Sequence, residues 1–237
     1  MALPILNNVT LHELTIPSTG KNVNYRPYLI KEEKILLQAK ESENDKQMMQ
    51  AITKLIAACV EDVNVDELTT FDVEYIFLQL RGKSSGEVIE VGYNCPHCEA
   101  SNEIQVDLSL VNIVGDTIDK NVIVELTPDI NIELGYIKYN KMINSMNFKK
   151  KSDDNAEIFT MVKNAIVSVN TEEERMIFAD ESTKDQDAFL DSLSSTQFQK
   201  ITDFFTEGPS VVYNSKHTCM SCTKEFGVEL KGMDNFF

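Results

Sequence analysis

Two Cys-x-x-Cys pairs that lie far apart in the chain constrain the fold of this sequence more than any other feature. Cys95 and Cys98 form the first pair, and Cys219 and Cys222 form the second. Zinc favours four ligands in a tetrahedron, and a Cys-x-x-Cys turn brings two thiolates to one ion at about 2.3 Å. The four cysteines therefore predict one bound zinc ion, which would join two distant parts of the chain.

Strand-like sequence flanks both pairs. Apolar and polar residues alternate over residues 87–93 and 104–108 around the first pair, and residues 211–213 and 226–230 flank the second. Such alternation is typical of half-buried strands. We interpret the two strand–knuckle–strand segments as halves of one zinc-ribbon-like β module. Because all four expected ligands are sulfur, no position stays open for water or substrate, so the zinc is expected to be structural.

The remaining candidate ligands receive a different interpretation. His97 and His217 lie beside the knuckles and are expected to stay outside the coordination sphere, since four cysteines already complete it. Cys59 lies alone in the apolar run of residues 55–60 and is expected to be a buried core thiol.

The distance between the pairs predicts an insertion. A short zinc ribbon usually separates its two pairs by about 15–20 residues, far fewer than here. We therefore expect an α+β fold in three parts. Residues 1–115 would contain an N-terminal hairpin, helices and the first half of the ribbon, residues 116–209 a mainly helical insertion, and residues 210–237 the second half of the ribbon and a C-terminal tail.

Local signals place the other elements. A turn at residues 17–20 between apolar stretches predicts a β-hairpin, and apolar spacing predicts helices over residues 31–40, 45–60 and 70–82, with Asn44 or Asp45 capping the second and Gly82 ending the third. In the insertion, residues 122–126 read as a strand. Helices are predicted from Asp154 to about residue 169 and from the capping box at Ser194 to Gly208.

Composition excludes several functions. The formal charge of −16 disfavours binding to nucleic acid or to an anionic membrane, and the one basic cluster, residues 149–151, reads as a solvated turn. Three histidines and the absence of nucleotide-binding or hydrolase motifs indicate a protein that is not an enzyme and has no small-molecule substrate. The first seven residues do not resemble a signal peptide, so we expect a cytoplasmic protein.

Several local patterns together resemble the baseplate hub assembly proteins of T-even-like tailed bacteriophages. They are residues 14–20 with 25–28, residues 31–34, residues 71–75 with 80–84, the first knuckle at 95–98, and residues 230–237. The resemblance implies a factor that acts when the central hub of a contractile tail baseplate is assembled, as a hub subunit or as a helper that is not retained. It also implies other hub proteins as partners, and the host cytoplasm or the virion tail as the location.

Two rival functions follow from the cysteines alone. A zinc-ribbon nucleic-acid-binding or transcription-type factor would place basic residues on the ribbon, whereas this ribbon carries acidic ones. A thiol–disulfide oxidoreductase would place a Cys-x-x-Cys at a helix N-terminus. A further question concerns Phe236 and Phe237, which either dock on a partner or fold back onto the core of this chain.

Overall fold

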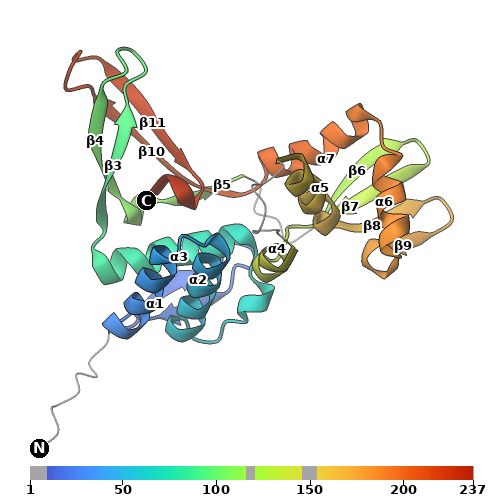
Figure 1. Cartoon of the computed structure of the whole chain (residues 1–237), viewed down its shortest axis with the longest axis horizontal. Helices are drawn as coiled ribbons and strands as arrows, with labels where there is room; N and C mark the ends of the chain where they lie inside the picture. Colours follow the sequence, from blue (N-terminus) through green and yellow to red (C-terminus); the bar gives the residue numbers. More distant parts are fainter. Residues whose placement is uncertain (1–9, 116–120, 146–153, 237) are drawn as a thin grey trace, which may run out of the picture. The chain divides into compact units, whose positions relative to one another are not determined.

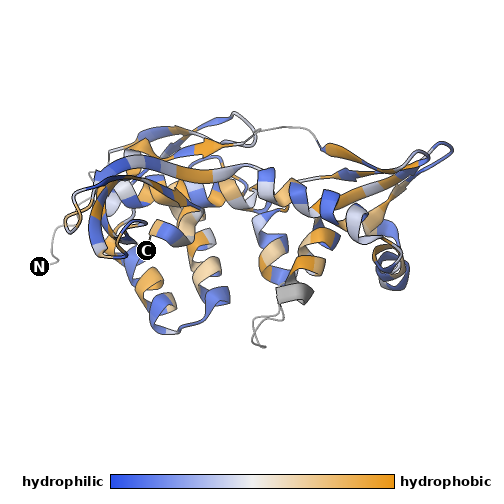
Figure 2. Ribbon diagram, turned by 90° about the horizontal axis from the view of Figure 1, so that it is seen from above, coloured by the Kyte–Doolittle hydropathy of each residue, from blue (hydrophilic) through white to orange (hydrophobic). Residues whose placement is uncertain are grey.

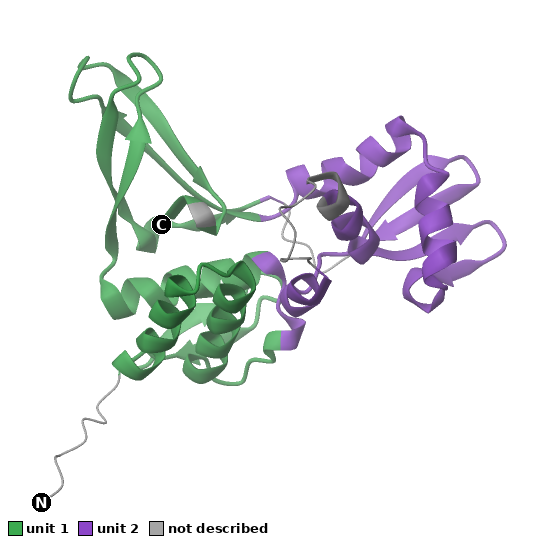
Figure 3. Cartoon of the chain, in the orientation of Figure 1, with its two compact units in different colours: residues 1–65, 71–114, 210–237 green, residues 66–70, 115–209 purple. Residues whose placement is uncertain are grey.

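The chain divides into two compact units (Figure 3). Unit 1 comprises Met1–Val65, Phe71–Val114 and Ser210–Phe237, and unit 2 comprises Asp66–Thr70 and Gly115–Pro209. The structure is a computed structural model that describes residues 10–115, 121–145 and 154–236. The basic cluster at residues 149–151 lies outside the described residues. The architecture is α+β, as predicted, with several small antiparallel sheets (Figure 1).

The N-terminal part of unit 1 is a hairpin followed by three helices. The hairpin pairs β1 (His12–Thr15) with β2 (Asn22–Tyr25), and the helices are α1 (Ile30–Glu41), α2 (Asp45–Cys59) and α3 (Thr70–Ser85). Asn44 caps α2, because its side chain accepts a hydrogen bond of 3.0 Å from the Gln47 N–H. The hairpin and the beginning of α2 thus follow the local signals in the sequence.

A buried carboxylate connects the hairpin turn to α3. Asp72 is fully buried and accepts a hydrogen bond of 2.8 Å from the Ser18 N–H. The turn itself is closed by the Gly20 N–H, which donates to the Ile16 carbonyl at 2.9 Å, and Gly20 adopts a φ of 66° that favours glycine. This contact holds the turn at residues 17–20 against the first turn of α3.

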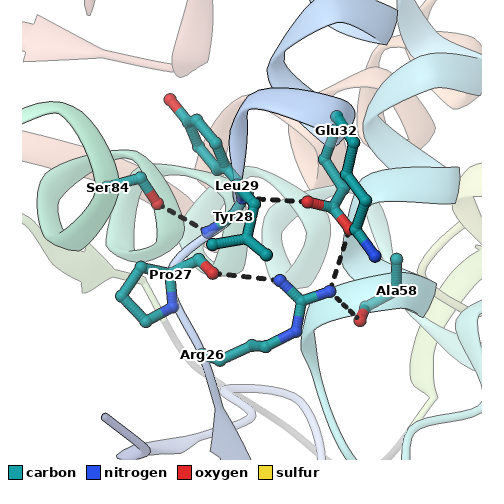
Figure 4. A network of polar contacts seen from close by, with 8 residues as sticks. Arg26, Pro27, Tyr28, Leu29, Glu32, Ala58 and Ser84 are labelled. Atoms are coloured by element: carbon teal, nitrogen blue, oxygen red, sulfur yellow. Dashed lines mark hydrogen bonds and ion pairs between the residues drawn. The ribbon is translucent and has the colours of Figure 1, made fainter. Parts of the chain in front are cut away.

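An arginine connects β2 to the first two helices (Figure 4). The Arg26 guanidinium donates to the Glu32 carboxylate at 2.9 Å and to the Ala58 carbonyl at 3.0 Å, while Glu32 also accepts from the Leu29 N–H at 2.8 Å. Burial raises the pKa of Glu32, but the hydrogen bonds from Arg26 and Leu29 outweigh it and the pKa is lowered. The motif around Arg26 is therefore structural.

The prediction that Gly82 ends the third helix is wrong. The helix continues to Ser85, and Gly82 is buried inside it, where an added Cβ would lie 3.6 Å from the Leu108 Cβ. Gly86 follows the helix with a φ of 110°, a conformation that other residues rarely adopt. Gly82 thus lies within the helix, beside Leu108, and Gly86 lets the chain turn.

Two small sheets complete unit 1. One pairs β3 (Val88–Asn94) with β4 (Ser101–Asp107), and the other has the order β11–β10–β5, with β5 at Asn112–Val114, β10 at Ser210–Thr218 and β11 at Glu225–Lys231. Buried and exposed residues alternate along β4 and β11. The strands of the chain carry both hydrophobic and hydrophilic residues (Figure 2). The buried sides of these two strands share one hydrophobic core, in which Tyr93 stacks on Phe226 at 6.0 Å between ring centroids.

The C-terminal tail folds back onto this core. Phe236 lies in the short helix η4 (Met233–Phe236), its side chain is 1% exposed, and it packs in the core that β4, β10 and β11 share with Leu78 of α3. Its carbonyl also accepts a hydrogen bond of 3.2 Å from the Arg81 guanidinium. Phe236 is therefore a core residue rather than an exposed anchor for a partner, and Phe237 lies outside the described residues.

Unit 2 contains a four-stranded antiparallel sheet as well as helices. Its order is β6–β7–β8–β9, formed by Val122–Thr127, Ile130–Leu134, Ile166–Thr171 and Arg175–Ile177. The helices are α4 (Tyr139–Ser145), α5 (Asp154–Ala165), α6 (Thr183–Asp191) and α7 (Ser195–Glu207). Residues 66–70 join this unit because the Tyr139 N–H donates to the Leu68 carbonyl at 2.9 Å.

The insertion contains more strand than the sequence predicted, which was residues 122–126 alone. The helix predicted from Asp154 to about residue 169 ends at Ala165, and β8 begins at the next residue. The segment Ile166–Thr171 is rich in β-branched residues, which favour strands, although Ile166 and Val169 also have helical spacing. The capping box predicted at Ser194 is confirmed, since Ser194 and Gln197 make both of its hydrogen bonds.

A hydrogen-bonded carboxylate on this sheet is expected to make the stability of unit 2 depend on pH. Glu133 accepts hydrogen bonds from Arg175 at 2.7 Å, Asn121 at 2.6 Å and Ser168 at 2.8 Å, and these bonds lower its pKa from 4.5 to about 2. A carboxylate with a lowered pKa stabilises the fold above its unfolded pKa and loses that effect as pH falls through the folded value. We expect the stability of unit 2 to decrease between about pH 5 and pH 2.

Urea unfolding of Glu133→Gln tests this expectation. The variant should be less stable than the original chain at pH 7, and the difference should shrink at pH 3, where the Glu133 carboxylate has lost much of its stabilising effect. Glu174→Gln removes an exposed carboxylate from the neighbouring turn and serves as the matched control. A difference that stays constant with pH would refute the assigned role of Glu133.

Candidate metal centre

The first Cys-x-x-Cys forms a tight knuckle between β3 and β4. The Cys95 N–H donates to the Ala100 carbonyl at 2.9 Å, and the Glu99 N–H donates back to the Cys95 carbonyl at 2.8 Å. These two bonds close the turn, so that both cysteines lie on one side of it at the end of the hairpin.

The second knuckle, between β10 and β11, repeats the same hydrogen bonds. The Cys219 N–H donates to the Lys224 carbonyl at 2.9 Å, and the Thr223 N–H donates to the Cys219 carbonyl at 2.9 Å. Glu99 and Thr223 occupy equivalent positions and have nearly the same left-handed φ, 60° and 59°. The two knuckles therefore have the same local fold, although no pattern in the sequence indicated these two strained positions.

The four sulfur atoms converge. Cys95 Sγ lies 3.8 Å from Cys222 Sγ, Cys98 Sγ lies 3.6 Å from Cys219 Sγ, and all four lie within 4.8 Å of one another. A tetrahedron with arms of about 2.3 Å, the length of a zinc–sulfur bond, has edges of about 3.8 Å. The cysteines that the sequence singled out are thus brought close enough to hold one metal ion.

Hydrogen bonds around the sulfur atoms shift the pKa values of Cys98 and Cys219 in opposite directions. The Cys222 and Ser221 N–H groups donate to Cys219 Sγ at 3.5 and 3.4 Å and lower the pKa of Cys219 to about 6. The Ala100 N–H also lowers the pKa of Cys98, but hydrogen bonds with Cys222 and the other sulfurs outweigh it and raise the pKa to about 12. Four adjacent thiolates repel one another, so full ionisation requires a cation among them.

A buried asparagine connects the two knuckles. Asn102, on β4, is 6% exposed; its amide nitrogen donates to the Ala100 carbonyl at 2.8 Å and its amide oxygen accepts from the Met220 N–H at 3.0 Å. Sequence reasoning missed this residue. The available signal was a polar side chain at an inward position of the alternating strand that also holds Ile104 and Val106.

The other candidate ligands lie outside the sulfur cluster. His97 is exposed, and His217 is half-buried with its Nε2 2.9 Å from Ser215 Oγ. Cys59 is 2% exposed, and burial raises the pKa of its thiol to about 11, as expected for a core thiol. Both Cys-x-x-Cys turns join two strands, which is not the helix N-terminus that a thioredoxin-like dithiol requires.

The sequence match gives the family. Residues 9–237 match the family described as T4 bacteriophage base plate protein. The chain belongs to this family. The match runs through both units and both knuckles of this base plate protein, and it confirms the resemblance to baseplate proteins of T-even-like phages. No curated protein and no solved structure matches the chain.

Proposed function

We propose that this base plate protein acts in the assembly of the phage baseplate hub, as a hub subunit or as a helper, through protein–protein contacts. The match to base plate proteins over nearly the whole chain carries this proposal. The cluster of four cysteines supports a structural rather than an enzymatic role, because four sulfur ligands would leave a bound metal ion no open position for a substrate.

We further propose that the four cysteines hold one structural zinc ion. Sulfur spacings of 3.6 and 3.8 Å support zinc in a zinc-ribbon-like arrangement. When bound, the ion supplies a double positive charge that stabilises the thiolates. The residues of the chain position the ligands: each knuckle presents two sulfur atoms, and the hydrogen bonds of Asn102 hold one knuckle against the other.

The expected partners are other hub proteins, in the host cytoplasm during assembly and in the virion tail if the protein is retained. Within the described ranges, the helices are too short or too polar to cross a membrane. Affinity purification of the tagged chain from infected cells, followed by mass spectrometry, tests the proposal. We expect baseplate proteins to be enriched over a tagged control, whereas enrichment of replication or transcription proteins alone would contradict a hub role.

An assay of nucleic-acid binding distinguishes the proposed hub function from the rival function of a zinc-ribbon transcription factor. The formal charge is −16, and the exposed positions of β3, β4 and β11 include Glu90, Glu103 and Glu229. We expect no appreciable binding to DNA or RNA at about 0.15 M salt in a gel-shift assay. Sub-micromolar binding that weakens with added salt would overturn this expectation and favour the rival function.

A further inference from the structure

Unit 2 contains a small apolar pocket that the metal centre does not involve. Its floor is formed by Val169 of β8, Met176 of β9, Phe178 of the short helix η3 (Phe178–Asp180) and Phe189 of α6. The volume is about 160 Å³. Ligand sites for small molecules usually measure about 300–1,000 Å³, so this pocket is suited to one side chain rather than to a cofactor.

The walls of the pocket are held in place. Phe178 and Phe189 contact edge to face, with 5.9 Å between centroids and an interplanar angle of 67°. The Gln186 amide donates to the Phe178 carbonyl at 2.8 Å and to the Glu181 carbonyl at 3.1 Å, which ties η3 to α6. The pocket is therefore formed before a partner arrives.

The rim of the pocket is acidic. Glu181 and Asp185 line it, and both are exposed. Asp185 also accepts a hydrogen bond from Ser182 Oγ. Two cations near this lining are already paired, Arg175 with Glu133 at 2.7 Å and Lys163 with Asp187 of α6 at 2.7 Å. Lys184 is the other basic residue between Glu172 and Asp191. A negatively charged side chain would be repelled here, and a neutral apolar one would gain nothing from the rim.

We propose that this pocket receives a lysine or arginine side chain from a partner protein. The aliphatic stem of such a side chain would lie across the apolar floor, against the rings of Phe178 and Phe189. The carboxylates of Glu181 and Asp185 would then neutralise the charged end at the rim. The partner surface that faces unit 2 is thus basic, which complements the formal charge of −16 of the whole chain.

Methyl NMR of the full chain, labelled at the methionine methyl groups, tests the proposal. The probes are N-acetyl-arginine amide, N-acetyl-lysine amide with its free ε-amine, and N-acetyl-norleucine amide, which has an aliphatic side chain without the charge. We expect both charged probes to shift the Met176 methyl signal with saturation in the millimolar range. The norleucine probe should bind at least about twofold more weakly, the lower limit expected from an exposed ion pair. The Met220 methyl, which belongs to unit 1 and is 88% exposed, should not respond.

Charge-removing variants complete the test. Glu181→Gln should weaken the binding of both charged probes about twofold to fivefold and leave the binding of the norleucine probe unchanged. Glu173→Gln removes the same charge from an exposed position that does not line the pocket, and should have no effect. The proposal is overturned if Met176 shows no saturable shift, or if norleucine binds as well as the charged probes. Equal effects of the two variants would also overturn it. None of these outcomes depends on the hub assignment or on the zinc.

Discussion

Replacing Cys95 or Cys222 with serine is expected to lower the melting temperature of unit 1 by about 10 °C or more. Each residue comes from a different knuckle, and their sulfurs lie 3.8 Å apart. In zinc-finger peptides the binding of structural zinc contributes about 10–16 kcal/mol to folding, so the loss of one ligand removes much of the free energy that would join the two sheets. Thermal unfolding followed by circular dichroism measures the effect.

Cys59→Ser is the matched control for these variants. Cys59 is as buried as the knuckle cysteines Cys95 and Cys219, but it lies outside the sulfur cluster. Cys59→Ser should lower the free energy of unfolding by only about 1–3 kcal/mol, the penalty for burying a hydroxyl group without a hydrogen-bond partner. A chelator should lower the melting temperature of the original chain and of Cys59→Ser, and change Cys95→Ser little. Equal destabilisation by all the serine variants would show that the knuckle thiols contribute packing alone.

Phe236→Ala is expected to destabilise unit 1 by about 3–5 kcal/mol. The ring is almost completely buried in the core that joins the knuckle strands to α3, and the surrounding helix and sheets cannot close the cavity fully. Chemical unfolding measures the change. Met220→Ala removes a side chain that is 88% exposed, and should change stability by less than about 0.5 kcal/mol.

Phe236→Ala also distinguishes a role of the ring in the core from a role in docking on a partner during assembly. If Phe236 acts only through folding, Phe236→Ala should impair baseplate assembly at high temperature, and growth at low temperature should restore it because more of the chain is folded. An unchanged stability together with a loss of assembly at every temperature would instead identify the ring as a partner contact.

Local chemistry made part of this fold predictable. Asn44 and Ser194 cap helices where a short polar side chain precedes an apolar periodic run, a signal that needs only a few neighbouring residues. The two cysteine pairs predicted a contact between distant segments, because one metal ion requires four ligands at one point. The convergence of the four sulfurs within 4.8 Å follows that requirement.

Other parts of the fold depend on contacts between distant residues, which no local sequence pattern indicates. Gly82 looked like a helix end because glycine is common there, yet it lies buried inside the helix, beside Leu108. The apolar spacing predicts a helix over the first residues of β8, because short apolar runs fit both the helix and the strand periodicity. The pairing of β8 with β7 and β9 favours the strand. The position of Phe236 depends on Leu78 and Arg81, which are distant in the chain.

The metal content of the freshly purified, reduced chain tests the central claim most directly. Inductively coupled plasma mass spectrometry, combined with a protein concentration from amino-acid analysis, gives the ratio of zinc to protein. If Cys95, Cys98, Cys219 and Cys222 hold one structural zinc ion, the ratio is about one per chain and falls toward zero in a variant that lacks one knuckle pair. A chain that is folded and stable but carries no metal would contradict the account.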